Sequence, residues 1–355
     1  MKTITHKTIL LISPQSWGNM FVSKHHYALE LARAGNTVYF LNPPEEKIAG
    51  RSEKIRIVPS EIHDSLFLIQ HRLSFPYDIK FHFISLFHKL VRPHIKRVLR
   101  QIGKPIDIVW SFDLGNLYRF DFFPESAIKI FHPVDEPLNE TAIQSAFGAD
   151  LIISVTPEIL NKYRKYNVPQ HYIGHGVSDE FILSPIAYRP PVRPYRVGIS
   201  GNLLRSDIDR GIMLSIISSN AEIIFECWGS YQIQHSNLGG VENDGLKYFI
   251  RELQSMQNVK LHGPVPAHQL AKEFKLMDSF LICYDIEKDQ SRGTNYHKVL
   301  EYISTGKVVI ANNITAYKDM ADLVVMPKGR NNNNDLPVLF SRVMRQLDIY
   351  NTEIL

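Results

Sequence analysis

The sequence has little of several features that mark particular classes of protein. Among its 355 residues there are only two cysteines, Cys227 and Cys283, both in apolar surroundings. This excludes a disulfide framework and a cysteine-based zinc site, and it indicates buried thiols in a reducing compartment. No apolar run approaches the ~20 residues that a membrane-spanning helix requires. Met1 to Ser13 leads straight into a predicted strand without a cleavage motif, so we expect no signal peptide and a cytoplasmic protein.

A strong excess of charge of either sign is also lacking. The formal net charge is +4 and the isoelectric point is near 8.8. Such mild basicity does not indicate a dedicated nucleic-acid binder, and the basic residues follow no known nucleic-acid-binding motif. With 355 residues and 44% hydrophobic residues, the chain is expected to form two globular domains of similar size.

The N-terminal half begins with an alternation of strand and helix. Apolar runs at 8–13 and 37–41 predict strands, and the segment 24–34 between them has the apolar spacing of a helix. Strand, helix and strand in this order are the beginning of a parallel sheet. The first turn contains Gly18 but no Gly-x-Gly-x-x-Gly, so a nicotinamide-dinucleotide site is not indicated.

Two further predicted strands of this half, 106–111 and 127–131, are followed by titratable residues. Asp113 follows the first strand, and His132 and Asp135 follow the second. In open parallel sheets, ligands bind at the carboxyl ends of the strands. A carboxylate or histidine in such a position can deprotonate an acceptor hydroxyl as a general base. The alternative interpretation is that these residues only cap the segments that follow.

The segment 79–106 contains no acidic residue. It mixes lysines and arginines with large apolar side chains, and it contains Pro93, which we expect to break or kink a helix. A basic amphipathic helix is attracted to an anionic lipid surface. A core helix with a solvated basic face fits the same pattern equally well, so both interpretations stay open.

A proline-rich stretch separates the two halves of the chain. The prolines are Pro185, Pro190, Pro191 and Pro194, and such density predicts a linker. We therefore place the boundary between a first domain, 1–185, and a second domain, 186–355. The last predicted helix, 336–350, is expected to end the second domain or to pack back on the first.

The most informative stretch is 291–312. Thr294 and Asn295 suit the start of a helix, and Gly306 suits its left-handed end. Lys298 and Glu301 are three residues apart and therefore share one face. A helix start with a lysine suits a phosphate, and a carboxylate one turn further can accept hydrogen bonds from a ribose diol. The alternative is a surface helix with an ordinary Lys/Glu pair.

Residues 297–302, His-Lys-Val-Leu-Glu-Tyr, are followed by Gly-Lys-Val-Val at 306–309. This resembles the K-x-x-E-Y-x-x-x-G-K-P-V-V signature of GT-B glycosyltransferases, in particular the bacterial family 4-like enzymes that build surface polysaccharides. The segment 149–181, the turn at Gly263 and the loop after Gly201 resemble further signatures of that family.

The resemblance implies an α/β fold of two Rossmann-like domains whose parallel sheets face each other across a cleft. It implies transfer of a sugar from a nucleoside-diphosphate sugar, of the UDP or GDP type, to a hydroxyl acceptor. The acceptor would be a sugar or a lipid-linked sugar, which favours a location on the inner face of the cell membrane, with 79–106 as the contact. We expect no cofactor. Because the chain is taken to lack an Asp-x-Asp triplet, we also expect no essential metal ion.

The family's roles carry over to individual residues of this chain. Donor binding falls on Gly201, Asn202, Arg205, Arg210, Gly229, Gly263, Val265, Thr294, Asn295, Lys298 and Glu301. Acceptor binding falls on Trp17, Gly18, Asn19 and His25. Asp135 is the first candidate for the catalytic residue, with Asp113 and His132 as further candidates.

The chain departs from the family's pattern at two positions. Gly293 stands where many retaining members have a glutamate that holds the donor sugar, and Asn202 stands where the family has an arginine. Two other functions are therefore considered. A sugar-nucleotide epimerase of similar double-Rossmann form would convert the nucleotide sugar without an acceptor. A non-catalytic binding protein would keep the fold after losing the activity.

Overall fold

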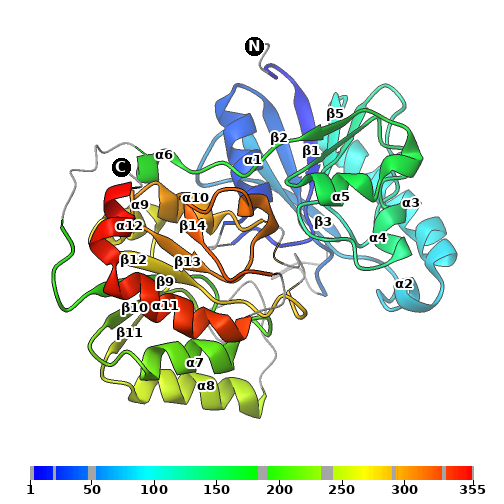
Figure 1. Ribbon diagram of the computed structural model, residues 1–355. Helices are drawn as coiled ribbons and strands as arrows, with labels where there is room; N and C mark the ends of the chain where they lie inside the picture. Colours follow the sequence, from blue (N-terminus) through cyan, green and yellow to red (C-terminus); the bar gives the residue numbers. More distant parts are fainter. Residues whose placement is uncertain are drawn as a thin grey trace. The chain divides into compact units, whose positions relative to one another are not determined.

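The computed structural model describes residues 4–18, 21–46, 53–182, 190–232, 243–289, 293, 295–329 and 333–353. The chain divides into two compact units, Met1–Gly174 and His175–Leu355. Each unit contains a mostly parallel sheet with helices packed on it (Figure 1), so the predicted α/β class is confirmed. The division falls ahead of the proline-rich stretch in which we placed the boundary, and 183–189 of that stretch lie outside the described residues.

The first unit contains an eight-stranded sheet. Its strands are β1 (Thr8–Ile12), β2 (Thr37–Leu41), β3 (Ile55–Pro59), β4 (Leu66–His71), β5 (Ile108–Ser111), β6 (Ile128–Phe131), β7 (Leu151–Ser154) and β8 (Gln170–Tyr172). The order across the sheet is β3-β4-β2-β1-β5-β6-β7-β8, and only β3 is antiparallel to its neighbour. The carboxyl ends of β1, β5 and β6 therefore meet at one edge, as expected for a binding site.

The helices of the first unit are α1 (Ser23–Arg33), α2 (Ile79–His82), α3 (Ile84–Ile102), α4 (Glu140–Gln144) and α5 (Pro157–Asn161). At the start of α5 the Thr156 hydroxyl accepts the Ile159 N–H at 3.2 Å, and Pro157 occupies the first helical position. Both features are favoured at helix starts. No helix of the described residues is both long enough and apolar enough to cross a membrane.

Of the expectation that Pro93 breaks or kinks the helix of 79–106, the break is wrong. Helix α3 runs through Pro93 without interruption, and the break lies at Phe83, whose φ of −140° separates α2 from α3. An internal proline costs about 3 kcal/mol. Burial of a large apolar side chain contributes about 1.5–3 kcal/mol. Since α3 buries Phe87, Val91 and four further residues, its packing outweighs the proline.

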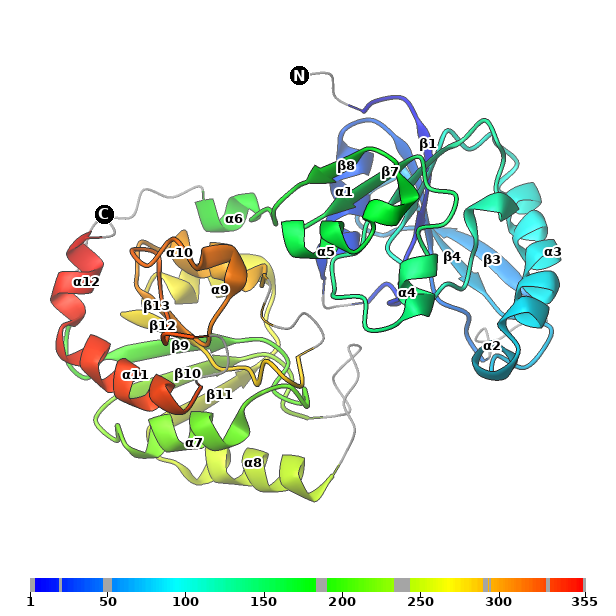
Figure 2. The ribbon, with the colours of Figure 1, turned by 45° about the vertical axis from the view of Figure 1, so that its right-hand side comes forward.

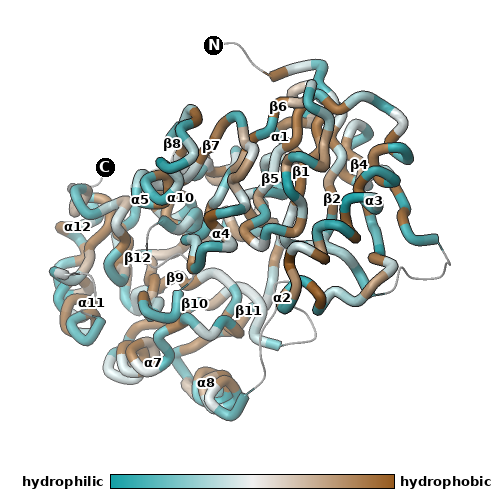
Figure 3. The backbone as a smooth tube through the Cα atoms, turned by 90° about the vertical axis from the view of Figure 1, so that its right-hand side faces the viewer, coloured by the Kyte–Doolittle hydropathy of each residue, from teal (hydrophilic) through white to brown (hydrophobic). Residues whose placement is uncertain are grey.

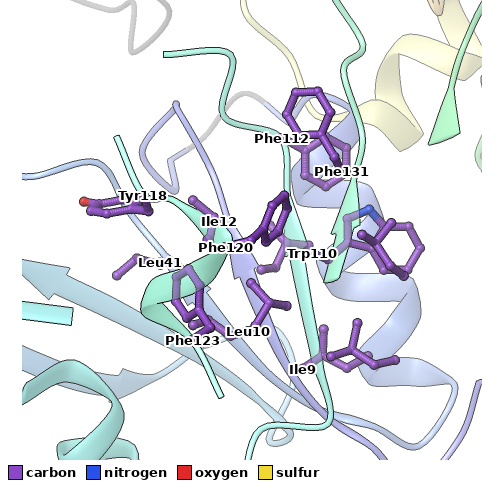
Figure 4. Packing of buried hydrophobic residues seen from close by; sticks show 14 of the residues in the cluster. Ile9, Leu10, Ile12, Leu41, Trp110, Phe112, Tyr118, Phe120, Phe123 and Phe131 are labelled. Carbon is purple, nitrogen blue, oxygen red and sulfur yellow. The ribbon is translucent and has the colours of Figure 1, made fainter. Parts of the chain in front are cut away.

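The core of the first unit is built from branched and aromatic side chains. Residues 9–12 of β1 are almost completely buried, and Trp110, Phe112 and Phe131 pack beside them (Figure 4). A central parallel strand is covered on both faces, so its sequence is a continuous apolar run and does not alternate between apolar and polar residues. Surface helices, in contrast, have one hydrophobic and one hydrophilic side. Helix α8 (Asp244–Ser255) of the second unit is an example, with brown and teal sides in Figure 3.

The second unit contains a six-stranded parallel sheet. Its strands are β9 (Arg196–Ser200), β10 (Ile224–Trp228), β11 (Val259–Gly263), β12 (Ser279–Ile282), β13 (Val309–Ala311) and β14 (Val324–Val325). Their order is β11-β10-β9-β12-β13-β14.

The other helices of the second unit are α6 (Asp179–Ile182), α7 (Arg210–Ser218), α9 (Ala267–Phe274), α10 (Lys298–Ile303), α11 (Leu336–Arg345) and α12 (Leu347–Glu353). Helices α7, α8 and α11 cover one face of the sheet, and α9 and α10 cover the other (Figures 1 and 2). Asn351 accepts the Val308 N–H at 2.9 Å and donates to the Asp278 carbonyl at 3.0 Å, so α12 is bound to the second unit.

Candidate functional site

Helix α10 is fixed to the end of β9 by two side chains that lie one turn apart. The Lys298 ammonium group donates to the Ser200 carbonyl at 2.6 Å. The Tyr302 hydroxyl accepts the Ser200 N–H at 2.7 Å and lies 2.9 Å from Ser200 Oγ. Tyr302 is completely buried and stacks on Phe280 with 4.2 Å between ring centroids. The predicted helix therefore exists, begins at Lys298, and carries its lysine to the carboxyl edge of the sheet.

Three predicted glycines meet in the loops beside this helix. The Gly201 N–H donates to the Trp228 carbonyl at 2.9 Å, and the Gly229 N–H donates to the Gly263 carbonyl at 2.8 Å. At Gly229 φ is +120°, and an added Cβ would lie 1.9 Å from the Gly201 carbonyl oxygen. Only glycine fits there, because any side chain would displace the neighbouring loop. Val265 follows Gly263 and lies half-buried against the core.

A small pocket lies next to Lys298. Its polar lining comes from Ser200, Gly201, Asn202, Tyr284 and Lys298, and its other walls are mostly apolar. The Lys298 ammonium donates a second hydrogen bond to the Tyr284 hydroxyl at 2.6 Å. An ammonium group carries three N–H donors, and the described residues accept two of them, so this buried lysine can offer the third to an anion. Sequence reasoning missed Tyr284, although its position just after β12, at the carboxyl edge, could have indicated it.

The loop after Gly201 uses its polar side chains mainly to shape itself. Asn202 Oδ1 accepts the Leu204 N–H at 3.0 Å. Arg205 forms an ion pair with Asp207 and lies 3.6 Å from Asp289 Oδ1. Burial is the largest single influence and disfavours its charge, but the hydrogen bond to Asp207 and the charge interactions with Tyr284, Asp207 and Asp289 together outweigh it and raise the pKa of Arg205. A diphosphate at this loop would compete with two carboxylates for Arg205.

Arg210, the first residue of α7, also lies at this loop. Its guanidinium donates to the Arg205 carbonyl at 3.2 Å and lies 5.8 Å from the centre of the Phe249 ring. Burial lowers the pKa of Arg210, with Asp207 acting against the shift. The structure thus brings Arg205 and Arg210 together. Arg205 is bound by Asp207, and Arg210 contacts the Arg205 carbonyl and the Phe249 ring.

Glu301 follows Lys298 on α10, as the spacing predicted. Burial raises the pKa of the Glu301 carboxyl to about 7, and the charge of Lys298 opposes this shift only in part. Carboxyl groups with such shifts gather at binding sites more often than elsewhere. A group that titrates near neutral pH can be converted to its ionised form by a ligand that donates hydrogen bonds to it.

Gly293 occupies a turn that excludes the family's glutamate. Its φ is +64°, and an added Cβ would lie 2.8 Å from the Asn313 carbonyl oxygen. Asp289 holds this turn, since one of its oxygens accepts the Gly293 N–H at 2.8 Å and the Tyr296 hydroxyl at 2.5 Å. Asn295 is buried beside it. Thr294 lies outside the described residues.

The expectation of no essential metal took Asp-x-Asp triplets to be absent, which is wrong, because Asp207, Ile208 and Asp209 form one. Asp207 is bound by Arg205. Asp209 caps α7 by accepting the Ile212 N–H at 3.2 Å, and it accepts Asn333 Nδ2 at 3.0 Å. Both carboxylates therefore have structural roles. No group of three or more potential metal ligands is found among the described residues.

In the first unit, the predicted acceptor residue His25 is part of the core. It is completely buried. Its Nδ1 accepts the Val22 N–H at 3.1 Å, its Nε2 lies 3.1 Å from the Ser16 carbonyl oxygen, and its ring stacks on Phe40. Burial lowers the pKa of His25 to about 4, so the ring is neutral. This histidine holds the loop before α1 in place.

The other predicted acceptor residues lie in that loop. Trp17 is half-buried, and its ring packs edge-on against Phe40 and Phe21. The backbone N–H of Trp17 donates to Asn42 Oδ1 at 2.7 Å, which ties the loop to the end of β2. Gly18 is half-buried next to it, and Asn19 lies outside the described residues.

Of the three catalytic candidates, two have structural bonds. Asp113 is buried, and its oxygens accept the Gly115 and Leu117 N–H groups, both at 2.7 Å. Burial raises the pKa of Asp113. His132 is completely buried, stacks on Phe112, and accepts the Trp110 Nε1–H at 3.3 Å.

Asp135 differs from both. It is half-buried at the end of β6, and within the described part of the chain its carboxylate has no direct hydrogen bond or salt bridge. Since its oxygens are not used by the surrounding loop, Asp135 is the strongest of the three candidates for contact with a substrate.

Comparisons with known proteins identify the fold. No protein-family model matches the sequence, and a search of curated proteins finds no significant match. Solved structures do match over nearly the whole chain. Sucrose-phosphate synthase from Thermosynechococcus elongatus is 14% identical with a TM-score of 0.63, covering 98% of this chain and 94% of that one. WaaG, a glycosyltransferase involved in lipopolysaccharide biosynthesis, is 11% identical with a TM-score of 0.62, covering 98% and 94%.

A third similar structure is the UDP-forming α,α-trehalose-phosphate synthase from Burkholderia xenovorans in complex with glucose-6-phosphate. It is 11% identical with a TM-score of 0.64 and covers 98% of this chain and 95% of that one. The chain has the GT-B fold. The resemblance noted in the sequence therefore predicted the fold correctly, and the two parallel sheets are those of this fold.

The contact between Gly229 and Gly201 can be tested by substitution. Gly229→Ala should lower the free energy of unfolding by about 3 kcal/mol or more, because the new Cβ collides with a backbone oxygen. Gly35→Ala is the matched control. It has a φ of +87° but nothing within 4 Å of its Cβ, so it should cost only about 1 to 2 kcal/mol. Urea denaturation measures both, and equal losses would contradict the steric argument.

The shifted pKa of Glu301 predicts a dependence of stability on pH. Because the folded pKa of about 7 lies above the ordinary value of 4.5, the folded state holds its proton longer, and stability falls as pH rises through this window. Glu301→Gln is neutral throughout. Between pH 4.5 and pH 8, the free energy of unfolding of Glu301→Gln should therefore rise by about 2 to 3 kcal/mol relative to that of the parent. Denaturant melts at both pH values test this, and a constant difference would contradict the shift.

Proposed function

We propose that this protein is a glycosyltransferase that moves a sugar from a nucleoside-diphosphate sugar to a hydroxyl acceptor. One observation carries the proposal. Lys298 is held by the Ser200 carbonyl and the Tyr284 hydroxyl beside the Gly201 loop, with the Glu301 carboxyl on the same short helix. A cation and a carboxyl at this spacing suit the phosphate and the ribose of one nucleotide. The GT-B fold, shared with glycosyltransferases of known structure, supports it.

The charge of Lys298 is the main contribution to diphosphate binding. Helix α10 has only six residues, so its macrodipole is weak compared with a full charge. Lys298 is 8% exposed, and charge-assisted hydrogen bonds are stronger in such partly desolvated positions. As the bond between the sugar and the diphosphate breaks, this ammonium would stabilise the negative charge on the leaving oxygen.

The first unit would supply the acceptor side of the reaction. The acceptor hydroxyl attacks the anomeric carbon of the donor sugar, a new glycosidic bond forms, and the nucleoside diphosphate leaves. The hydroxyl proton needs a base, and Asp135 is the candidate whose oxygens are not used by its own loop. Trp17 and Gly18, in the loop at the same edge of the sheet, would contact the acceptor sugar.

The acceptor is proposed to be a lipid-linked sugar in the assembly of a surface polysaccharide. An exposed apolar patch formed by Phe81, Phe83, Leu86 and Leu90 supports this. Phe81 and Phe83 are 68% and 66% exposed. Exposed basic residues of α3 lie on the same segment, namely Lys89, Arg92, Lys96, Arg97 and Arg100. Aromatic residues with neighbouring cations suit the surface of an anionic membrane, where the protein would act.

A non-catalytic nucleotide-sugar-binding protein is the second candidate. It is favoured by the Gly293 turn, which excludes the family's glutamate, and by the ion pair that engages Arg205. Release of nucleoside diphosphate in the presence of an acceptor separates the two candidates. Conversion of the nucleotide sugar without any acceptor would instead indicate an epimerase.

The donor site is tested by nucleotide binding. Lys298→Met and Glu301→Gln should each weaken the binding of UDP or GDP by about tenfold or more, because each removes a charge-assisted hydrogen bond. Isothermal titration calorimetry at pH 8 measures the dissociation constants. Lys272→Met, an exposed lysine of α9, is the control and should bind as the parent does.

Unchanged affinity in both Lys298→Met and Glu301→Gln would contradict the donor site. Far-ultraviolet circular dichroism distinguishes a lost contact from a lost fold. The parent protein must bind one of the two nucleotides, and failure with both would contradict the proposed function itself.

The membrane contact is tested by vesicle cosedimentation. The parent should sediment with vesicles that contain anionic lipid and should be released by high salt, because surface charge attraction is screened. Phe81→Ser with Phe83→Ser should reduce the bound fraction severalfold. Ile182→Ser with Val338→Ser removes two apolar side chains of the second unit that are 55% and 75% exposed, and it is the control. Absence of the parent from the vesicle pellet would refute the membrane contact.

A further inference from the structure

Lys24, in the first turn of α1, is a buried cation without a direct counterion. It is 3% exposed. Within the described residues its ammonium group has no hydrogen bond or salt bridge, and the nearest influence of opposite sign is the charge of Asp135, which acts on it from a longer distance. Lysine is almost never fully buried unless it is paired, because removing its charge from water is costly. The position therefore suits an anion that binds there.

The surroundings of Lys24 show which edge of the sheet it faces. Tyr27, three residues further on α1, packs on Trp110, Phe112 and His132, with ring centroids 5.0 to 5.7 Å apart. This face of α1 therefore lies over the ends of β5 and β6. Residues three apart in a helix share a face, so Lys24 lies on the same side, nearer to the start of the helix. Asp135 follows His132 by three residues at that edge.

The start of α1 adds to the positive potential at this place. The helix has eleven residues, no acidic residue in its first turn and no side-chain cap at its N-cap, Val22. The unpaired N–H groups of a helix start favour a negative charge. Burial lowers the pKa of Lys24, and Asp135 acts against that shift only in part. An anion bound here would raise that pKa again, because it favours the charged form of the lysine.

A purely structural role as counterion of Asp135 fits less well. A structural ion pair in a buried position is stable only when the two groups are in direct contact and hydrogen-bonded. Lys24 and Asp135 influence each other without forming such a pair. The two side chains are therefore placed as neighbours around a substrate rather than as partners of each other.

We propose that Lys24 binds an anionic group of the acceptor, a phosphate or a carboxylate that lies close to the reacting hydroxyl. This rests on the proposed function, which assigns the first unit to the acceptor. Asp135 would take the proton of the hydroxyl, and Lys24 would hold the neighbouring anion. The acceptor is thus a charged sugar or a phosphate-linked sugar, and uncharged sugars lack the group that this lysine recognises.

Thermal unfolding of the whole chain tests the proposal without requiring activity. The probes are inorganic phosphate, a hexose 6-phosphate, a uronic acid and a polyprenyl phosphate in detergent, with the neutral hexose and detergent as blanks, all at constant ionic strength. The soluble and lipid probes distinguish the two sources of phosphate. At least one charged probe should raise the melting temperature of the parent by a few degrees, and the neutral hexose should not.

The decisive variant is Lys24→Met, which keeps the length of the side chain and removes its charge. It should melt at or above the parent's temperature without a probe, and it should need about tenfold or more of the charged probe for the same shift. Lys24→Arg should retain the response. Lys104→Met, an exposed lysine after α3, is the matched control and should behave as the parent does.

Three results would overturn the proposal. They are an equal response of Lys24→Met and the parent, a parent that responds to none of the anions, and a lower melting temperature of Lys24→Met without a probe, which would indicate a structural counterion.

Calorimetry with UDP and GDP distinguishes the acceptor role of Lys24 from a role in donor binding. Lys24→Met should bind the nucleotide as the parent does, and a loss there would assign the lysine to the donor instead. If the parent binds neither nucleotide, the proposed function fails, whereas the anion responses still decide the role of Lys24.

Discussion

The attachment of α10 to Ser200 is the constraint on which the proposed donor site depends. Lys298 and Tyr302 reach the same residue from adjacent turns, one through its ammonium group and the other through its hydroxyl. Gly201 suits this arrangement, because its φ is +130° and a Cβ there would lie 2.6 Å from Lys298 Nζ and would displace the ammonium group. The tyrosine of the K-x-x-E-Y pattern thus has a structural role, and its buried hydroxyl sets the position of the lysine that precedes it.

Most polar groups at the carboxyl edges of the two sheets serve the loops that contain them. Asp113, Asp209 and Asp289 each accept backbone N–H groups and shape a turn. Irregular loops leave backbone donors without partners, and a short carboxylate is an efficient way to satisfy them. The informative side chains are therefore Lys298 and Asp135, whose polar atoms are not fully used in hydrogen bonds to the surrounding loops of the described residues. Such polar atoms are the ones that can contact a ligand.

Sequence reasoning predicted the fold and the position of α10 well, because both depend on local patterns. Central parallel strands appear as continuous apolar runs, and Gly306 has the positive φ that its place after α10 required. The errors depend on contacts between distant segments. The core face of α3 overrides Pro93. The burial of His25, a predicted acceptor residue, against Phe40 and Ser16 depends on such contacts too. Tyr284 and Lys24 were missed for the same reason. The hydrogen bond of Tyr284 to Lys298 and the burial of Lys24 cannot be predicted from the residues next to them in the sequence.

The two thiols of the chain have a practical consequence for studies in solution. Cys227 and Cys283 are both buried in the second unit, and burial raises the pKa of Cys227 to about 12. Since the thiolate is the reactive form, maleimide reagents will leave both of them unmodified in the folded protein. A pair of cysteines introduced at exposed positions, one on each unit, can therefore carry a fluorescent donor and acceptor dye without removal of the native thiols. Energy transfer between the dyes would then report any movement of the units when a nucleotide is added.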